Sequence, residues 1–137
     1  VWDRSGSRVL AQYAYPLDPV DAEDTGVSEL LAIDDHRLLA LERSWGPARG
    51  YRVLLYEIDL REATDVLDRD SLRDASYRPV TKRLVHDLSS VPHPVENYEA
   101  LAWGPQLMTG ERTLVIASDD NFSTAEKSLF LLFKVAA

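Results

Sequence analysis

Short runs of apolar and β-branched residues alternate with polar, turn-forming segments along most of the chain. Such runs predict β-strands, and they cover residues 8–17, 27–33, 37–41, 51–60, 79–88 and 128–135. Residues 97–122 hold two further runs joined by a turn, with apolar centres at 101–103 and 114–116. The pattern therefore predicts an all-β fold.

Residues 61–78 interrupt this pattern because they are rich in charged residues. Two interpretations are open for this stretch. Residues 63–75 have the spacing of a short amphipathic helix with Val66, Leu67 and Leu72 facing inward. An irregular excursion between two strands fits the composition equally well.

The order of strands, turns and polar loops repeats along the chain. Residues 28–33 correspond to 98–103, residues 38–43 to 114–119, and residues 51–58 to 128–135. The first unit also has a fourth run at 79–88. Four-stranded units repeated in sequence are the blades of a β-propeller, so residues 1–137 are predicted to be a single, partial propeller domain. Its units span about 27–88 and 97–135, and residues 8–17 form an extra strand.

About two blades are fewer than the four to eight that a closed propeller contains. The open edges of such a piece would be covered by missing blades or by self-association with other copies.

Composition limits the function classes. The 23 acidic and 15 basic side chains give a net charge of −8, which argues against a nucleic-acid partner. The absence of cysteine excludes disulfides, thiolate catalysis and cysteine-ligated zinc. No run approaches the ~20 apolar residues of a membrane-spanning helix.

The strand pair within 97–122 places polar side chains at one end of a sheet. Asn97 and Glu99 open its first strand, and Asp119, Asp120 and Asn121 close its second. Antiparallel pairing brings the start of one strand beside the end of the next. Carboxylate and carboxamide oxygens are the ligands that Ca²⁺ prefers, so these five residues are a candidate metal site. The alternative is an Asx turn at 119–121, with Glu99 paired to an arginine such as Arg43.

Glu42 and Arg43 end the corresponding strand of the first unit, and Glu29 is the repeat equivalent of Glu99. If both units point the same way, Glu42 and Arg43 line the same central face. Arg43 then has the chemistry to bind a phosphate or carboxylate through two hydrogen bonds. The alternative is a structural ion pair. Since no Gly-x-Ser-x-Gly elbow surrounds Ser28, Ser44 or Ser118, serine esterase chemistry is disfavoured.

Several of these segments together resemble the phytase-like family, also described as the esterase-like activity of phytase. The resemblance is carried, in order, by residues 26–32, 37–43, 52–60, 63–66, 79–84, 97–105, 118–123 and 130–135. It covers about residues 26–135 and corresponds to the C-terminal part of the family's domain. One position departs from the family pattern, since Ala100 stands where glycine is usual.

The resemblance implies a bacterial, periplasmic or secreted hydrolase acting on small-molecule esters or phosphoesters. It attributes activity to recurring acidic residues, here Glu29, Glu42, Glu99, Asp119 and Asp120. The leading hypothesis is hydrolysis assisted by a divalent cation such as Ca²⁺, with Glu42 or Glu29 as base and Arg43 neutralising charge. The alternative is a non-catalytic ligand-binding or scaffold propeller whose acidic residues are structural.

Overall fold

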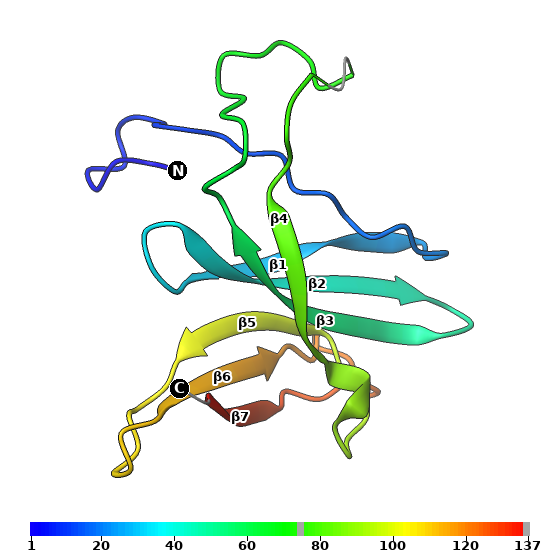
Figure 1. Cartoon of the computed structure of the whole chain (residues 1–137). Coiled ribbons are helices and arrows are strands. Elements are labelled where there is room, and N and C mark those ends of the chain that lie inside the picture. Colours follow the sequence, from blue (N-terminus) through cyan, green and yellow to red (C-terminus); the bar gives the residue numbers. More distant parts are fainter. Residues whose placement is uncertain (74–75, 136–137) are drawn as a thin grey trace.

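Two antiparallel β-sheets make up the computed structural model, which describes residues 1–73 and 76–135 (Figure 1). The first sheet contains, in spatial order, β1 (Asp24–Ala32), β2 (Arg37–Gly46), β3 (Gly50–Asp59) and β4 (Thr81–Asp87). The second contains β5 (Tyr98–Trp103), β6 (Arg112–Ser118) and β7 (Phe130–Val135). A single 3₁₀ turn, η1 (Leu88–Ser90), follows β4. The all-β prediction is confirmed.

Tight turns fix the register of the first sheet. The β2–β3 hairpin closes between Gly46 and Gly50. Gly50 has a φ of 69°, which a glycine adopts without the steric cost of a side chain. Between β1 and β2, the Asp34 carboxylate accepts hydrogen bonds from the backbone amides of His36 and Arg37 at 2.9 and 2.8 Å. Both turns occur where the sequence changes from apolar to polar.

The Asp34 turn gives the fold a predicted acid dependence. The His36 amide and the Arg37 side chain lower the pKa of Asp34 to about 2, against about 3.9 in an unfolded chain. Because the unfolded chain binds more protons in that window, we expect stability to fall as the pH drops from about 4 to 2. Urea unfolding at pH 5 and pH 2.5 measures the loss, and Asp34→Asn should reduce it. Asp35→Asn, one position along the same turn, is the matched control; equal effects of both variants would contradict the assignment.

The main hydrophobic core lies between the two sheets. Alternate residues of β2 and β3, such as Leu41 and Val53, are fully buried and face the second sheet. There they meet Tyr98 and Ile116, which are equally buried. Successive strand residues point to opposite faces, so every second residue of these runs belongs to this core.

A second core covers the opposite face of the first sheet. It is built from the other alternate residues of β2 and β3, including Ala40, Leu54 and Tyr56. Val80 completes the cluster, and Tyr13 and Tyr15 pack against it. Since β2 and β3 are buried on both faces at their centres, residues 38–41 and 53–56 are continuous apolar runs and not alternating ones.

The predicted strand over residues 8–17 is wrong. The segment is extended but outside both sheets, and its backbone bonds to the loop after β3. The Gln12 carbonyl accepts from the Val66 amide at 2.8 Å, and the Ala14 carbonyl accepts from the Val80 amide at 3.0 Å. The tyrosines that suggested a strand instead cover the outer face of the first sheet.

The described residues between β3 and β4 contain no helix. Residues 63–73 form turns and irregular backbone, so the excursion is the correct interpretation there; residues 74–75 lie outside the described part. The predicted strand over 79–88 is the shorter β4, followed by η1.

Each sheet takes its strands from one predicted repeat unit. The sheets lie against one another without closing into a ring (Figure 1), so the propeller stays a prediction. Within the described residues, no helix has the length and apolar character needed to span a bilayer.

Candidate functional site

The start of β5 lies beside the end of β6, as expected for this strand pair. Tyr98 pairs with Ser118, and the Asp119 amide donates to the Asn97 carbonyl at 3.1 Å. The backbone therefore brings both polar segments to one end of the second sheet.

Their side chains are used locally. The Asp120 carboxylate accepts from the Phe122 amide at 3.0 Å, which is the Asx turn. Asn121 is in the left-handed region, with a φ of 49°, and its side-chain Nδ2 donates to the Glu126 carboxylate at 2.8 Å. Asn97 is buried, and its Oδ1 has no partner among the described residues.

These contacts use several of the predicted calcium ligands within the protein. Among residues 1–73 and 76–135, no three histidine, aspartate or glutamate side chains come close enough together to hold a metal ion. Asp120 and Asn121 form hydrogen bonds within the turn. The Glu99 side chain is directed toward Arg43 of the first sheet. Calcium binding by Asn97, Glu99, Asp119, Asp120 and Asn121 stays a prediction.

Glu99 pairs with Arg43, the contact expected if the acids are structural. A β-bulge in β5 lies at Glu99, and bulges redirect side chains. Glu99 Oε1 lies 3.7 Å from Arg43 Nε, while Arg43 Nη2 lies 2.8 Å from the Asp24 carboxylate. The guanidinium also lies 5.7 Å from the centre of the Tyr51 ring. Arg43 thus joins β1, β2 and β5 at one end of the molecule.

An open hollow of about 310 Å³ lies beside this ion pair. We call it the Arg43 hollow; its lining residues are Asp24, Gly26, Val27, Ser28, Arg43 and Glu99. Ser28 is no free nucleophile, because its hydroxyl lies 3.2 Å from both the Leu41 and the Tyr98 carbonyls. The hollow therefore offers one guanidinium and two carboxylates to a ligand.

Glu42 does not share this site, so its predicted position on the same face as Arg43 is wrong. Neighbouring strand residues point to opposite faces, and Glu42 points into the second core with only 4% exposure. Its carboxylate accepts from the Tyr15 hydroxyl at 2.8 Å, the Asp18 amide at 3.1 Å and Lys82 Nζ at 2.8 Å. Glu42 is the centre of a buried network that holds the N-terminal segment to the first sheet.

The same network shifts the pKa values of Asp18 and Tyr15. Lys82 Nζ also lies 2.7 Å from Asp18, and this hydrogen bond lowers the pKa of Asp18 below its ordinary value. Burial, followed by the hydrogen bond to Glu42, raises the pKa of the Tyr15 phenol. With these shifts Asp18 stays charged and Tyr15 stays neutral, which are the forms that the network requires.

Glu29 lies beside a bulge in β1, after Val27. Its Oε1 accepts from the backbone amide of the next residue, Leu30, at 2.8 Å. Glu29 does not line the Arg43 hollow, so the geometry does not place it beside a substrate in that hollow.

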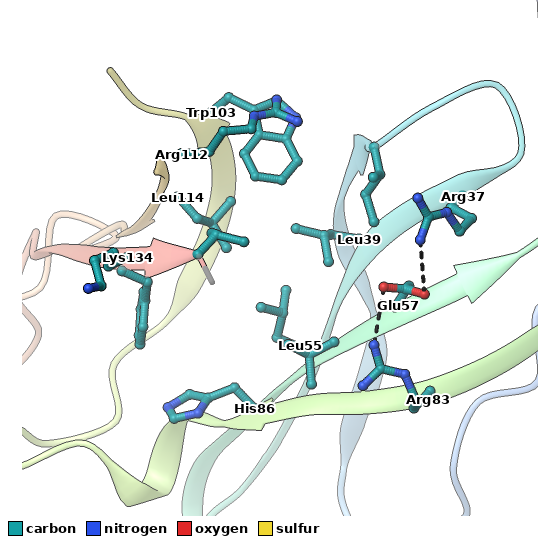
Figure 2. A pocket seen from close by; sticks show the side chains of 14 residues that line it. Arg37, Leu39, Leu55, Glu57, Arg83, His86, Trp103, Arg112, Leu114 and Lys134 are labelled. Carbon is teal, nitrogen blue, oxygen red and sulfur yellow. Dashed lines mark hydrogen bonds and ion pairs between the residues drawn. The ribbon is translucent and has the colours of Figure 1, made fainter. Parts of the chain in front are cut away.

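The sequence analysis missed a larger pocket between the two sheets (Figure 2). We call it the inter-sheet pocket; it has a volume of about 590 Å³. Its charged and aromatic lining residues are Arg37, Glu57, Arg83, His86, Trp103, Arg112, Phe133 and Lys134. The available signal was the placement of Arg37 and Arg112 at the first positions of β2 and β6, but bringing them together required knowing how the sheets pack.

Comparisons with known proteins gave one match. The model of a family described as "Phytase-like: Esterase-like activity of phytase" matches residues 1–122 of the 137-residue chain. Searches of curated proteins and of solved structures found no match.

Proposed function

Because this chain belongs to the phytase-like family, we propose that it is a hydrolase of ester or phosphoester bonds whose substrate binds in the Arg43 hollow. The observation that carries the proposal is the position of Arg43. Its side chain is 20% exposed, lies between two carboxylates and borders an open hollow. A guanidinium held in this way is prepared to bind a planar or tetrahedral oxyanion.

The proposed reaction needs one cation and one base. Arg43 donates hydrogen bonds to the carbonyl or phosphoryl oxygen and stabilises the negative charge that develops there. Glu99, whose side chain is 39% exposed, accepts a proton from the attacking water. The water oxygen forms the new bond to carbon or phosphorus. The alcohol oxygen leaves with the electrons of the broken bond and takes a proton from solvent.

The proposal changes the roles expected from the sequence. Glu99 replaces Glu42 and Glu29 as base, because Glu42 is buried in the second core and Glu29 lies outside the hollow. Asp24, which the sequence analysis did not select, positions the Arg43 guanidinium at 2.8 Å. Periplasmic or secreted location belongs to the proposal through the family resemblance alone.

The two sheets are further proposed to be units of a β-propeller. In the repeat alignment, Leu39 corresponds to Val115 and Leu41 to Ala117. Leu39 and Leu41 face the second sheet, whereas Val115 and Ala117 alternate with the core residue Ile116 and so face away from the first sheet. For β2 and β6 the equivalent faces thus point in the same direction along the stack, which supports the propeller arrangement. In β1 and β5 they do not, since Leu31 and Leu101, which the same alignment equates, both pack in the core between the sheets.

We expect Arg43→Met to lower kcat/KM for an ester or phosphoester by about 100-fold, because one donor to the developing oxyanion is lost. Initial rates with nitrophenyl substrates measure this. Arg49→Met, in the β2–β3 turn, is the control and should keep the wild-type rate. Matching rates for the two variants would exclude Arg43 from the reaction.

A non-catalytic ligand-binding or scaffold role is the second candidate. It is favoured by the two carboxylates that already partner Arg43. An absence of turnover on both esters and phosphoesters would favour this role over hydrolysis.

Calorimetric titration tests the calcium prediction separately. Stoichiometric binding that Asp119→Asn abolishes, and that Glu99→Ala weakens more than Glu57→Ala, would support a cation site. An absence of binding would leave these acids as structural partners.

A further inference from the structure

The inter-sheet pocket combines an apolar wall with a charged rim. Leu39, Leu55 and Leu114 line it from β2, β3 and β6 and are at most 6% exposed. Phe133 adds an aromatic surface from β7, with the His86 ring edge-on at a centroid distance of 5.2 Å. Its volume of about 590 Å³ lies within the range of small-molecule sites, about 300–1,000 Å³.

The charged side chains of this pocket are mostly cationic, although the chain as a whole carries −8. Arg37 and Arg83 approach from the first sheet, and Arg112 and Lys134 from the second, as Figure 2 shows. Glu57 is the one carboxylate in the lining. A local excess of positive charge on an acidic protein requires a specific explanation, and an anionic ligand supplies one.

Arg112 is the cation most available to a ligand. Its guanidinium lies 3.7 Å from the centre of the Trp103 ring, a cation–π contact that leaves its N–H groups free to donate. No carboxylate of the described residues forms an ion pair with it. Trp103 is itself fixed, because its indole N–H donates to the Ala32 carbonyl of the first sheet at 2.9 Å.

The other cations are held by weak, exposed pairs. Arg37 pairs with Asp34 at 2.8 Å and lies 3.8 Å from Glu57, which lies 3.2 Å from Arg83. These pairs keep both arginines at the rim (Figure 2). Lys134 pairs with Glu111 at 2.8 Å, with its side chain 62% exposed. Exposed pairs contribute little to stability, so a ligand acid group can replace them at little cost.

We propose that the inter-sheet pocket binds an organic anion with an apolar body and a single acid group, such as a medium-chain carboxylate. The apolar body lies against the leucine wall and Phe133. The acid group accepts hydrogen bonds from Arg112, with Lys134 and Arg83 close enough to the rim to add electrostatic attraction. This goes beyond the proposed hydrolysis, because the pocket shares no lining residue with the Arg43 hollow and is lined by no serine, threonine or cysteine.

The test follows the Trp103 indole N–H signal by NMR during titration with decanoate. The signal is assigned with Trp103→Phe, and the indole signals of Trp2 and Trp45 serve as internal controls. We expect decanoate to shift the Trp103 signal in a saturable way, and to bind at least tenfold more tightly than decanol or acetate. Decanol has the apolar body without the charge, and acetate the charge without the body.

A variant completes the test. Arg112→Met should weaken decanoate binding about tenfold, whereas Arg49→Met should leave it unchanged. The folded state of each variant is checked by its dispersed NMR spectrum. Equal binding of decanol and decanoate would overturn the charge requirement, and full-strength binding by Arg112→Met would overturn the role of Arg112. No shift of Trp103 with decanoate would overturn the site.

Discussion

Replacing Lys82 with methionine is expected to lower the free energy of unfolding by about 3–5 kcal/mol, the cost of leaving a buried charge without its partner. Glu42 is 4% exposed and the Lys82 side chain 12%. In the variant, the Glu42 carboxylate keeps the Tyr15 hydroxyl and the Asp18 amide but loses its only salt bridge among the described residues. Urea unfolding followed by far-UV circular dichroism measures the change.

Two further variants separate charge from packing. Glu42→Gln combined with Lys82→Met removes both charges and should recover part of the lost stability, because no unpaired charge stays buried. Arg83→Met removes a cation from the same strand whose side chain is 69% exposed, and it should cost no more than about 1 kcal/mol. Equal losses for Lys82→Met and Arg83→Met would contradict the buried pair.

Leu41→Ala should lower the free energy of unfolding by about 2–5 kcal/mol, because it opens a cavity in the core between the sheets. Leu41 is fully buried there, beside Val53, Tyr98 and Ile116. Thermal and urea unfolding both report the loss.

Leu30→Ala is the matched control for this change. Leu30 lies on the neighbouring strand β1 and is 49% exposed, so its truncation leaves no enclosed cavity. We expect a loss below about 1 kcal/mol, the range of substitutions at exposed positions. If both variants lost the same stability, the packing of the two sheets would be wrong.

The strands could be predicted because the apolar runs and the turn residues agree with one another. Residues 37–41 and 51–60 are apolar runs bounded by polar turns, and they became β2 and β3. Residues 8–17 have a comparable pattern and are not a strand. Tyr13 and Tyr15 are placed by burial against the second core, while the backbone bonds to Val66 and Val80. An apolar pattern reports burial, and it does not specify which backbone groups pair.

The candidate site was only partly predictable. The meeting of Asn97 with Asp119 follows from strand direction alone. The separation of Glu42 from Arg43 follows from strand alternation, and the predicted shared face disregards this alternation. The Arg43–Glu99 contact joins two sheets, and the inter-sheet pocket forms from both. Such features depend on how the sheets pack, which the order of strands leaves open.

Turnover of nitrophenyl butyrate and nitrophenyl phosphate by the purified chain tests the proposed hydrolysis most directly. The proposal predicts release of nitrophenol above the buffer rate on at least one of the two, in proportion to protein concentration, and a loss of about 100-fold in Arg43→Met. Rates equal to buffer on both substrates, or turnover unchanged by Arg43→Met, would contradict it. The pairs of Arg43 with Asp24 and Glu99 would then be structural, in a ligand-binding or scaffold protein.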